Sequence, residues 1–213
     1  MRRPGHRKSV FWRGRIAWVA VAAASLLHAG CFGSSAISVP SISPDEAGRL
    51  ALAEYDANGD GFLDAKELER CPALKGALKN VDKNGDGKLS ADEISQRLAE
   101  FVASNTGIIG VPCRVQLNDT ALEGATVTFV PEKFMGAGFA PASGVSDSRG
   151  QVILQLADQS VAGTRWGYYR IEVSKKDAAG VETLPPRYNT ATTLGQEIAP
   201  DRREAIVLRL LTK

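Results

Sequence analysis

Two twelve-residue stretches repeat one pattern of acids, amides and glycines, and this repeat constrains the fold more than any other feature of the chain. Residues 56–67 read DANGDGFLDAKE, and residues 82–93 read DKNGDGKLSADE. Each has oxygen-bearing side chains at positions 1, 3, 5 and 9, a glycine at position 6 and a glutamate at position 12. Glycine permits a sharp turn, around which the short side chains converge. The pattern therefore predicts two tight loops, each able to surround a hard cation.

The spacing D-x-[DN]-x-[DN]-G-x5-E is that of the EF-hand calcium loop, and both stretches satisfy it at every defined position. A surface turn rich in Asp, Asn and Gly is the alternative, but a turn does not require the glutamate at position 12. We expect two Ca2+ sites. The metal ligands expected in the first loop are Asp56, Asn58, Asp60, Phe62, Asp64 and Glu67. Those expected in the second loop are Asp82, Asn84, Asp86, Lys88, Ser90 and Glu93.

Within this set, Phe62 and Lys88 offer their backbone carbonyls, and Glu67 and Glu93 bind through both carboxylate oxygens. The first loop carries four acids and the second carries three. The loops begin at residues 56 and 82, a closer spacing than in calmodulin-like pairs, which this pair otherwise resembles. Such a compact pair has little room to open, which favours a structural or buffering module over a sensor.

The flanking residues predict the helices that enter and leave these loops. Ser43-Pro-Asp-Glu46 is a capping box that begins a helix running to Tyr55, and Pro72 begins a second entering helix. Residues expected to face a core from the first helix are Ala47, Leu50, Ala51 and Leu52. On the last helix the expected core residues are Ile94, Leu98, Phe101 and Val102, spaced as one helical stripe.

The first thirty residues have the pattern of an export signal. The chain is basic from Arg2 to Arg15, apolar from Ile16 to Leu27, and then reads Leu-His-Ala-Gly-Cys31. Ala-Gly-Cys resembles the lipobox of bacterial lipoproteins, although His28 stands where that pattern usually has leucine. We expect residues 1–30 to be removed, Cys31 to be lipidated, and residues 31–43 to form the lipidated cysteine and a tether. Ordinary cleavage near Ser34-Ser-Ala36, which yields a secreted soluble protein, is the alternative.

Removal of this segment changes the charge and the available chemistry. It takes away six of the 26 basic residues and no acidic one, which leaves 20 basic against 24 acidic residues. We therefore expect no nucleic-acid partner. Both histidines, His6 and His28, also lie in the segment. The remaining chain cannot use histidine as a general base or zinc ligand, and we expect that it is not an enzyme. A Cys71–Cys113 disulfide and a buried free thiol at Cys113 remain open alternatives.

After Gly107 the apolar pattern changes to a period of two. Alternating runs include residues 111–117, 125–129, 151–156, 169–173 and 206–210, with turn residues between them. We expect an α + β chain with two separate domains. These are an EF-hand pair over residues 44–104 and an antiparallel β-sandwich of about seven strands over residues 107–213. The two domains are expected to fold independently.

Three segments of this second half resemble the carboxypeptidase regulatory-like domain, a transthyretin-like β-sandwich. They are residues 117–131, 142–150 and 167–173, and the resemblance extends over roughly residues 109–211. Its motifs mark strands and turns, so the resemblance implies an accessory, structural or binding module with no catalytic residues to carry over.

Together these patterns favour a calcium-binding lipoprotein of the bacterial cell envelope, held to a membrane by its lipid and in contact with an unknown protein or envelope polymer. A calcium-dependent adhesion or docking module of the dockerin type is the alternative, but dockerins lack the entering helices expected here. A carboxylate-based hydrolase would need two acids converging in a cleft of the sandwich, and the strand spacing identifies no such pair.

Overall fold

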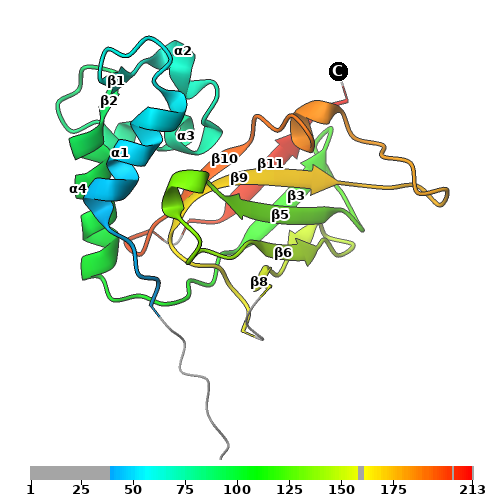
Figure 1. The fold of residues 1–213 in the computed structure, drawn as a ribbon. Coiled ribbons are helices and arrows are strands. Elements are labelled where there is room, and N and C mark those ends of the chain that lie inside the picture. Colours follow the sequence, from blue (N-terminus) through cyan, green and yellow to red (C-terminus); the bar gives the residue numbers. More distant parts are fainter. Residues whose placement is uncertain (1–38, 158–160, 203, 213) are drawn as a thin grey trace, which may run out of the picture. The chain divides into compact units, whose positions relative to one another are not determined.

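The fold is taken from a computed structural model that describes residues 39–157, 161–202 and 204–212. A helical region comes first and a β-rich region follows it (Figure 1). The described residues lie within one compact unit.

Four α-helices form the first region, and two of them start where the sequence predicts. Ser43 caps α1, where its hydroxyl accepts a hydrogen bond of 3.4 Å from the Glu46 N–H. The helices are α1 (Pro44–Tyr55), α2 (Ala65–Leu68), α3 (Pro72–Val81) and α4 (Ala91–Ala103). Two short strands, β1 (Phe62–Leu63) and β2 (Leu89–Ser90), lie in the loops.

Two residues expected in the helical core are exposed, namely Leu50 and Val102. The buried face of α1 consists instead of small residues and Tyr55. At Gly48 the backbone of α1 approaches α4 so closely that a Cβ atom would overlap Ser95 and Ala91. Because this close approach fixes which face of α1 points inward, Leu50 turns towards solvent.

The β-rich region contains two sheets and two 3-10 turns, η1 (Lys133–Met135) and η2 (Pro186–Tyr188). One sheet has the order β10-β9-β5-β6-β8, and the other has β11-β3-β4, with β7 also paired to β3. The strands are β3 (Cys113–Leu117), β4 (Thr120–Ala121), β5 (Thr126–Pro131), β6 (Ala142–Val145), β7 (Gln151–Val152), β8 (Gln155–Leu156), β9 (Gly167–Ser174), β10 (Gly195–Ile198) and β11 (Ile206–Leu210).

Two details of the strand prediction are wrong. The expected all-antiparallel pairing fails at β11, which runs parallel to β3 with Leu208 opposite Val115. The alternating run 151–156 is divided between sheets, because β7 pairs with β3 whereas β8 pairs with β6. Period-two alternation records which side chains are buried, but it does not record the partner or direction of a strand.

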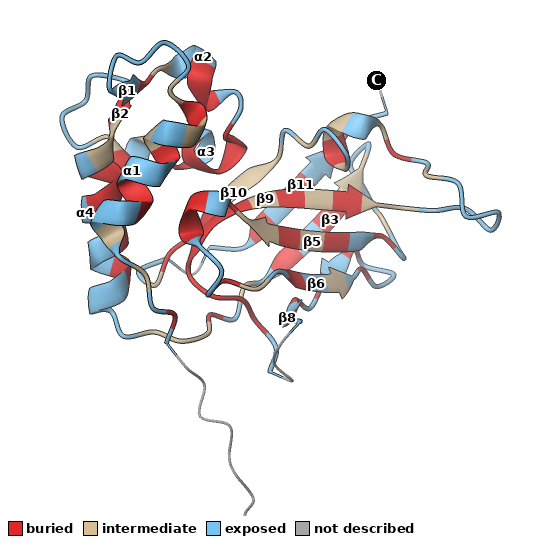
Figure 2. Cartoon of the chain, in the orientation of Figure 1, coloured by how far each residue is buried: buried red, intermediate tan, exposed pale blue. Residues whose placement is uncertain are grey.

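The first residues of β9 are buried on both faces, and this shows how the helical region packs. Neighbouring residues of a strand point to opposite faces of its sheet, yet Tyr168 and Tyr169 are both fully buried. Tyr169 packs against Phe129 of β5, whereas Tyr168 packs against Phe101 of α4. Helix α4 therefore packs against the start of β9, at the end of the five-stranded sheet beside the helical region (Figure 2).

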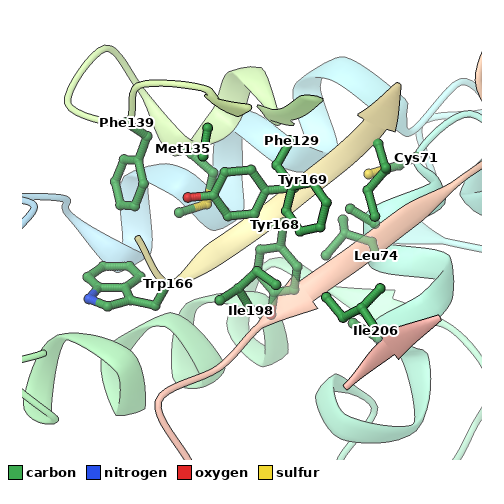
Figure 3. Packing of buried hydrophobic residues seen from close by; sticks show 14 of the residues in the cluster. Cys71, Leu74, Phe129, Met135, Phe139, Trp166, Tyr168, Tyr169, Ile198 and Ile206 are labelled. Atoms are coloured by element: carbon green, nitrogen blue, oxygen red, sulfur yellow. The ribbon is translucent and has the colours of Figure 1, made fainter. Parts of the chain in front are cut away.

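The helical and β-rich regions share one hydrophobic cluster. Cys71 and Leu74 from the helical region lie beside Tyr168 and Ile198 from the strands (Figure 3). The expectation of two separate domains with their own cores is therefore revised. The change from helix to strand that follows α4 marks a change of secondary structure inside a common core.

The shared core also bears on two smaller expectations, namely the extent of the tether and the state of the cysteines. Pro40 is buried and Ile42 packs against the cluster, so the last residues of the expected tether belong to the folded part. Cys71 and Cys113 are both buried free thiols rather than a disulfide. Burial raises the pKa of Cys113 to about 12, which makes this thiol a poor nucleophile.

Candidate metal centre

Four glycines shape the two loops. Gly59, Gly61, Gly85 and Gly87 all have φ between 72° and 84°, a region that glycine adopts without strain. The loops then join at position 8, where Leu63 of β1 pairs with Leu89 of β2 in antiparallel register. Both leucines are fully buried, so this short strand pairing links the two candidate sites through the hydrophobic core.

In the first loop the expected ligands already organise the backbone. The Asp56 carboxylate accepts hydrogen bonds from the N–H groups of Gly59 at 2.6 Å and Gly61 at 3.0 Å. Asn58 Oδ1 accepts from the Asp60 N–H at 2.7 Å, and Asp60 Oδ1 accepts from the Phe62 N–H at 3.0 Å. These bonds hold the side chains of positions 1, 3 and 5 inside the loop.

Glu67 closes the first loop from α2. Its Oε1 accepts from the N–H groups of Ala57 at 2.8 Å and Asn58 at 3.2 Å, and its Oε2 accepts from the Asp64 N–H at 3.0 Å. Asp64 in turn caps α2 through the Glu67 N–H at 2.9 Å. Positions 9 and 12 are thus fixed to each other by a capping box and to the start of the loop.

Three carboxylates converge in the first loop. One oxygen each from Asp56, Asp60 and Glu67 lies within 4.8 Å of the other two. Glu67 is 5 % exposed, an unusual position for an acid, and clustered carboxylates repel one another unless a cation neutralises them. The donor set is entirely oxygen, as Ca2+ requires, so the residues present fit this ion.

The second loop repeats the backbone hydrogen bonds of the first. The Asp82 carboxylate accepts from Gly85 at 2.6 Å and Gly87 at 2.9 Å. Glu93 Oε1 accepts from the Lys83 N–H at 3.1 Å, and its Oε2 accepts from the Ser90 hydroxyl at 2.8 Å. Glu93 is 7 % exposed. The expected ligands at positions 3 and 5 of the second loop are also linked, because Asn84 Oδ1 accepts a hydrogen bond from the Asp86 N–H at 2.8 Å.

The Lys88 side chain reaches across to the first loop. Its Nζ lies 3.4 Å from Asp60 Oδ2 and 5.5 Å from the centre of the Phe62 ring. The hydrogen bond from the Phe62 N–H, and to a smaller extent the Lys88 ammonium, hold the pKa of Asp60 below its usual range. The sequence assigned only a carbonyl role to Lys88, so this contact between the loops was missed.

A second set of residues supports the first loop from the β-rich region. Tyr55, which directly precedes Asp56, donates a hydrogen bond of 2.9 Å to Oε2 of Glu132. Beside it, Lys133 forms an ion pair with Glu54 at 2.9 Å. Glu132 is only 2 % exposed, and burial raises the pKa of its carboxyl. Nothing local in the sequence connects Glu132, which follows β5, with Tyr55, 77 residues earlier.

A matching contact supports the second loop. Asn80, two residues before Asp82, donates from Nδ2 to Glu197 Oε2 at 2.7 Å. Arg97 donates from Nε to Glu197 Oε1 at 2.9 Å and from Nη2 to Oε2 at 3.3 Å. Burial alone would lower the pKa of Arg97, but its bonds to Glu197, Glu100 and Asp201 hold that pKa above its ordinary value.

Cys31, the expected lipidation site, lies outside the described residues. Among the residues that the structure describes, no helix has the length and apolar character needed to cross a membrane.

Comparison with known proteins supports the helical region. The family model of the EF hand matches residues 49–72 and again residues 74–99, so each match contains one of the two loops. No curated protein matches the chain. The EF-hand motifs indicate calcium binding, and a β-rich region follows them.

Proposed function

We propose that this chain is an exported calcium-binding lipoprotein with a structural or interaction role and no catalysis. The convergence of Asp56, Asp60 and Glu67 in one loop carries the proposal. Their carboxylates repel one another, and a bound Ca2+ removes that repulsion. The second loop repeats the same ligand positions and hydrogen bonds, so both loops bind the ion.

The bound calcium has a structural role rather than that of a switch. A sensor opens by swinging its helices apart, which requires helices that are free to move. Here α2 is only four residues long, and α3 lies directly on β10. At Gly195 a Cβ atom would overlap the backbone of Pro72 and Ala73, so there is no layer of side chains between them to rearrange.

Calorimetric titration of the chelator-treated full chain with Ca2+ tests this function. Two sites are expected, and the first is the tighter because it has four acids. Dissociation constants of roughly 10⁻⁴ to 10⁻³ M suit a module outside the cytoplasm. Calcium at about one hundred times the dissociation constant should add ~2.7 kcal/mol of stability. Glu67→Gln should abolish the tighter site, whereas heat no greater than that of an Asp56→Ala/Asp82→Ala control would refute calcium binding.

The lipid anchor rests on the sequence Ala29-Gly30-Cys31 at the end of an apolar segment. In this proposal the chain belongs to the bacterial envelope and is held to a membrane through Cys31. Mass spectrometry of the native protein should find a diacylglyceryl group on an N-terminal Cys31. A lipid-free mature chain that begins near Ile37 would instead identify a secreted soluble protein.

The β-rich region is proposed to be a carboxypeptidase regulatory-like domain that contacts a protein or polymer of the envelope. Support comes from the three sequence segments that resemble that family and from the two sheets that the region forms. The lack of histidine in residues 29–213 supports a non-catalytic role. A pull-down from envelope extract with and without calcium would identify the partner.

A further inference from the structure

Two buried glutamates of the β-rich region contact the ends of the two entering helices. Glu132 accepts a hydrogen bond from Tyr55, the last residue of α1, at 2.9 Å. Glu197 accepts a hydrogen bond of 2.7 Å from Asn80, the residue before the last one of α3. The first calcium ligands, Asp56 and Asp82, follow these helix ends directly. The two EF-hand loops are thus anchored in the same way, each by its own glutamate.

We propose that Glu132 and Glu197 are positioning residues for calcium, so that the β-rich region is part of the calcium-binding unit. The proposal rests on the calcium function inferred above and assigns one anchor to each site. Glu132 acts through Tyr55 on the first loop. Glu197 acts through Asn80 on the second loop, and also through Arg97, which lies one helical turn after Glu93 on α4.

The physical reason is preorganisation. A metal-free loop whose entering helix can fray must be ordered when the ion binds, and that ordering reduces affinity. Tyr55 is 5 % exposed, and Glu132 and Glu197 are 2 % and 7 % exposed. The Tyr55–Glu132 bond is buried and the Asn80–Glu197 bond is partly buried, and hydrogen bonds shielded in this way hold the helix ends in place before calcium arrives. Each anchor should therefore raise the affinity of its own loop and leave the other loop unchanged.

Single-site variants allow the two anchors to be tested separately. Full-length chain carrying Glu93→Gln retains only the first site, and chain carrying Glu67→Gln retains only the second. Tyr55→Phe removes the hydroxyl that bonds Glu132 and keeps the ring. In calorimetric Ca2+ titrations it should weaken the first site about threefold to tenfold, the range of one buried hydrogen bond, and leave the second within twofold. Asn80→Ala should do the reverse.

Two further variants separate positioning from general destabilisation. Tyr188→Phe removes a hydroxyl that accepts a partly buried 2.8 Å bond from the Leu211 N–H inside the β-rich region, and it should leave both calcium affinities unchanged. Glu132→Gln keeps an acceptor for Tyr55 and should retain first-site affinity, whereas Glu132→Met should not. Urea unfolding of each variant records its stability separately.

The outcomes distinguish failure of the positioning roles from failure of calcium binding itself. Site-selective losses in Tyr55→Phe and Asn80→Ala support the anchors. If either variant weakens both sites equally, or if neither variant weakens its own site, the positioning roles are overturned and calcium binding stands. Failure of the unsubstituted chain to bind Ca2+ overturns the calcium function and the anchors with it.

Discussion

Arg97 on α4 and Glu197 on β10 lie 100 residues apart in the chain and are joined by two hydrogen bonds, of 2.9 and 3.3 Å. The side chains are 6 % and 3 % exposed, so both charges have been removed from water. Removal of one partner leaves the other as a buried, unpaired charge, which is more costly than the pair itself is stabilising. This pair therefore makes the contact between helices and sheet intolerant of change.

The first prediction follows from this pair. Arg97→Met should lower the free energy of unfolding by about 3–5 kcal/mol, measured by urea denaturation. Lys83→Met is the matched control, since Lys83 forms an exposed 3.4 Å ion pair with Glu100, another partner of Arg97. Its cost should stay below about 1 kcal/mol. Equal costs for the two substitutions would mean that the Arg97–Glu197 pair is not desolvated in solution.

The second prediction concerns pH and Glu132. Burial raises the pKa of this carboxyl, and the Tyr55 hydrogen bond and the Arg170 charge only partly oppose that shift. Cys71 and Glu54 also face this group of side chains. Because the folded-state pKa lies above the unfolded value of about 4.3, the favourable contribution of Glu132 is complete below that pH and is lost as pH rises. Glu132→Gln should therefore stabilise the protein at pH 7.5 more than at pH 4.

Glu182 provides the opposite case for the same experiment. Burial would raise the pKa of Glu182, but hydrogen bonds from Ser174 and from backbone N–H groups lower it below its usual value. Its contribution is present above the unfolded pKa and is lost as pH falls, so Glu182→Gln should destabilise the protein at pH 7.5 and have less effect at pH 4. Urea denaturation at both pH values measures the two variants. Parallel behaviour of the two would show that Glu132 is not buried as described.

The third prediction tests the contact between α3 and β10. Gly195→Ala would place a Cβ atom on the backbone of Pro72 and Ala73, which cannot move aside as a flexible side chain can. We expect a loss of about 1–3 kcal/mol or more by urea denaturation. Gly110→Ala, where nothing lies within 4 Å of the new atom, should stay within about 0.5 kcal/mol of the unsubstituted chain. A harmless Gly195→Ala would place α3 farther from the sheet.

The calcium loops could be predicted from the sequence because all the expected ligands of each loop lie within one stretch of twelve residues. The starts of α1 and α3 were equally accessible, since Ser43 and Pro72 are local signals. Their contacts with the sheet were not. Glu132 follows β5 and resembles a solvated loop residue, and Glu197 lies in a strand that lacks apolar alternation. Only the tertiary packing reveals that both are buried.

The same reasoning explains why the sequence predicted two separate domains, whereas the structure shows a shared hydrophobic cluster. The alternating run 169–173 separates Tyr169, Ile171 and Val173 from Arg170 and Glu172, and it does not include Tyr168. Tyr168, on the opposite face from Tyr169, is fully buried because α4 covers it with Phe101. A period-two pattern does not show whether a helix from elsewhere in the chain covers the polar side of a sheet. The sequence consequently indicated a β-rich region that is more independent than the structure shows.

The last prediction turns this correction into a measurement. A fragment beginning at Thr106 would expose Tyr168, Glu197 and the face of Trp166 that packs against Phe101 at 5.7 Å. Trp166 is the only tryptophan after residue 38, so the tryptophan fluorescence of either chain comes from this position. Relative to a chain of residues 39–213, the fragment should emit at longer wavelength and unfold at lower urea concentration. An equal unfolding midpoint and emission maximum would show that the β-rich region has an independent core, as the sequence first indicated.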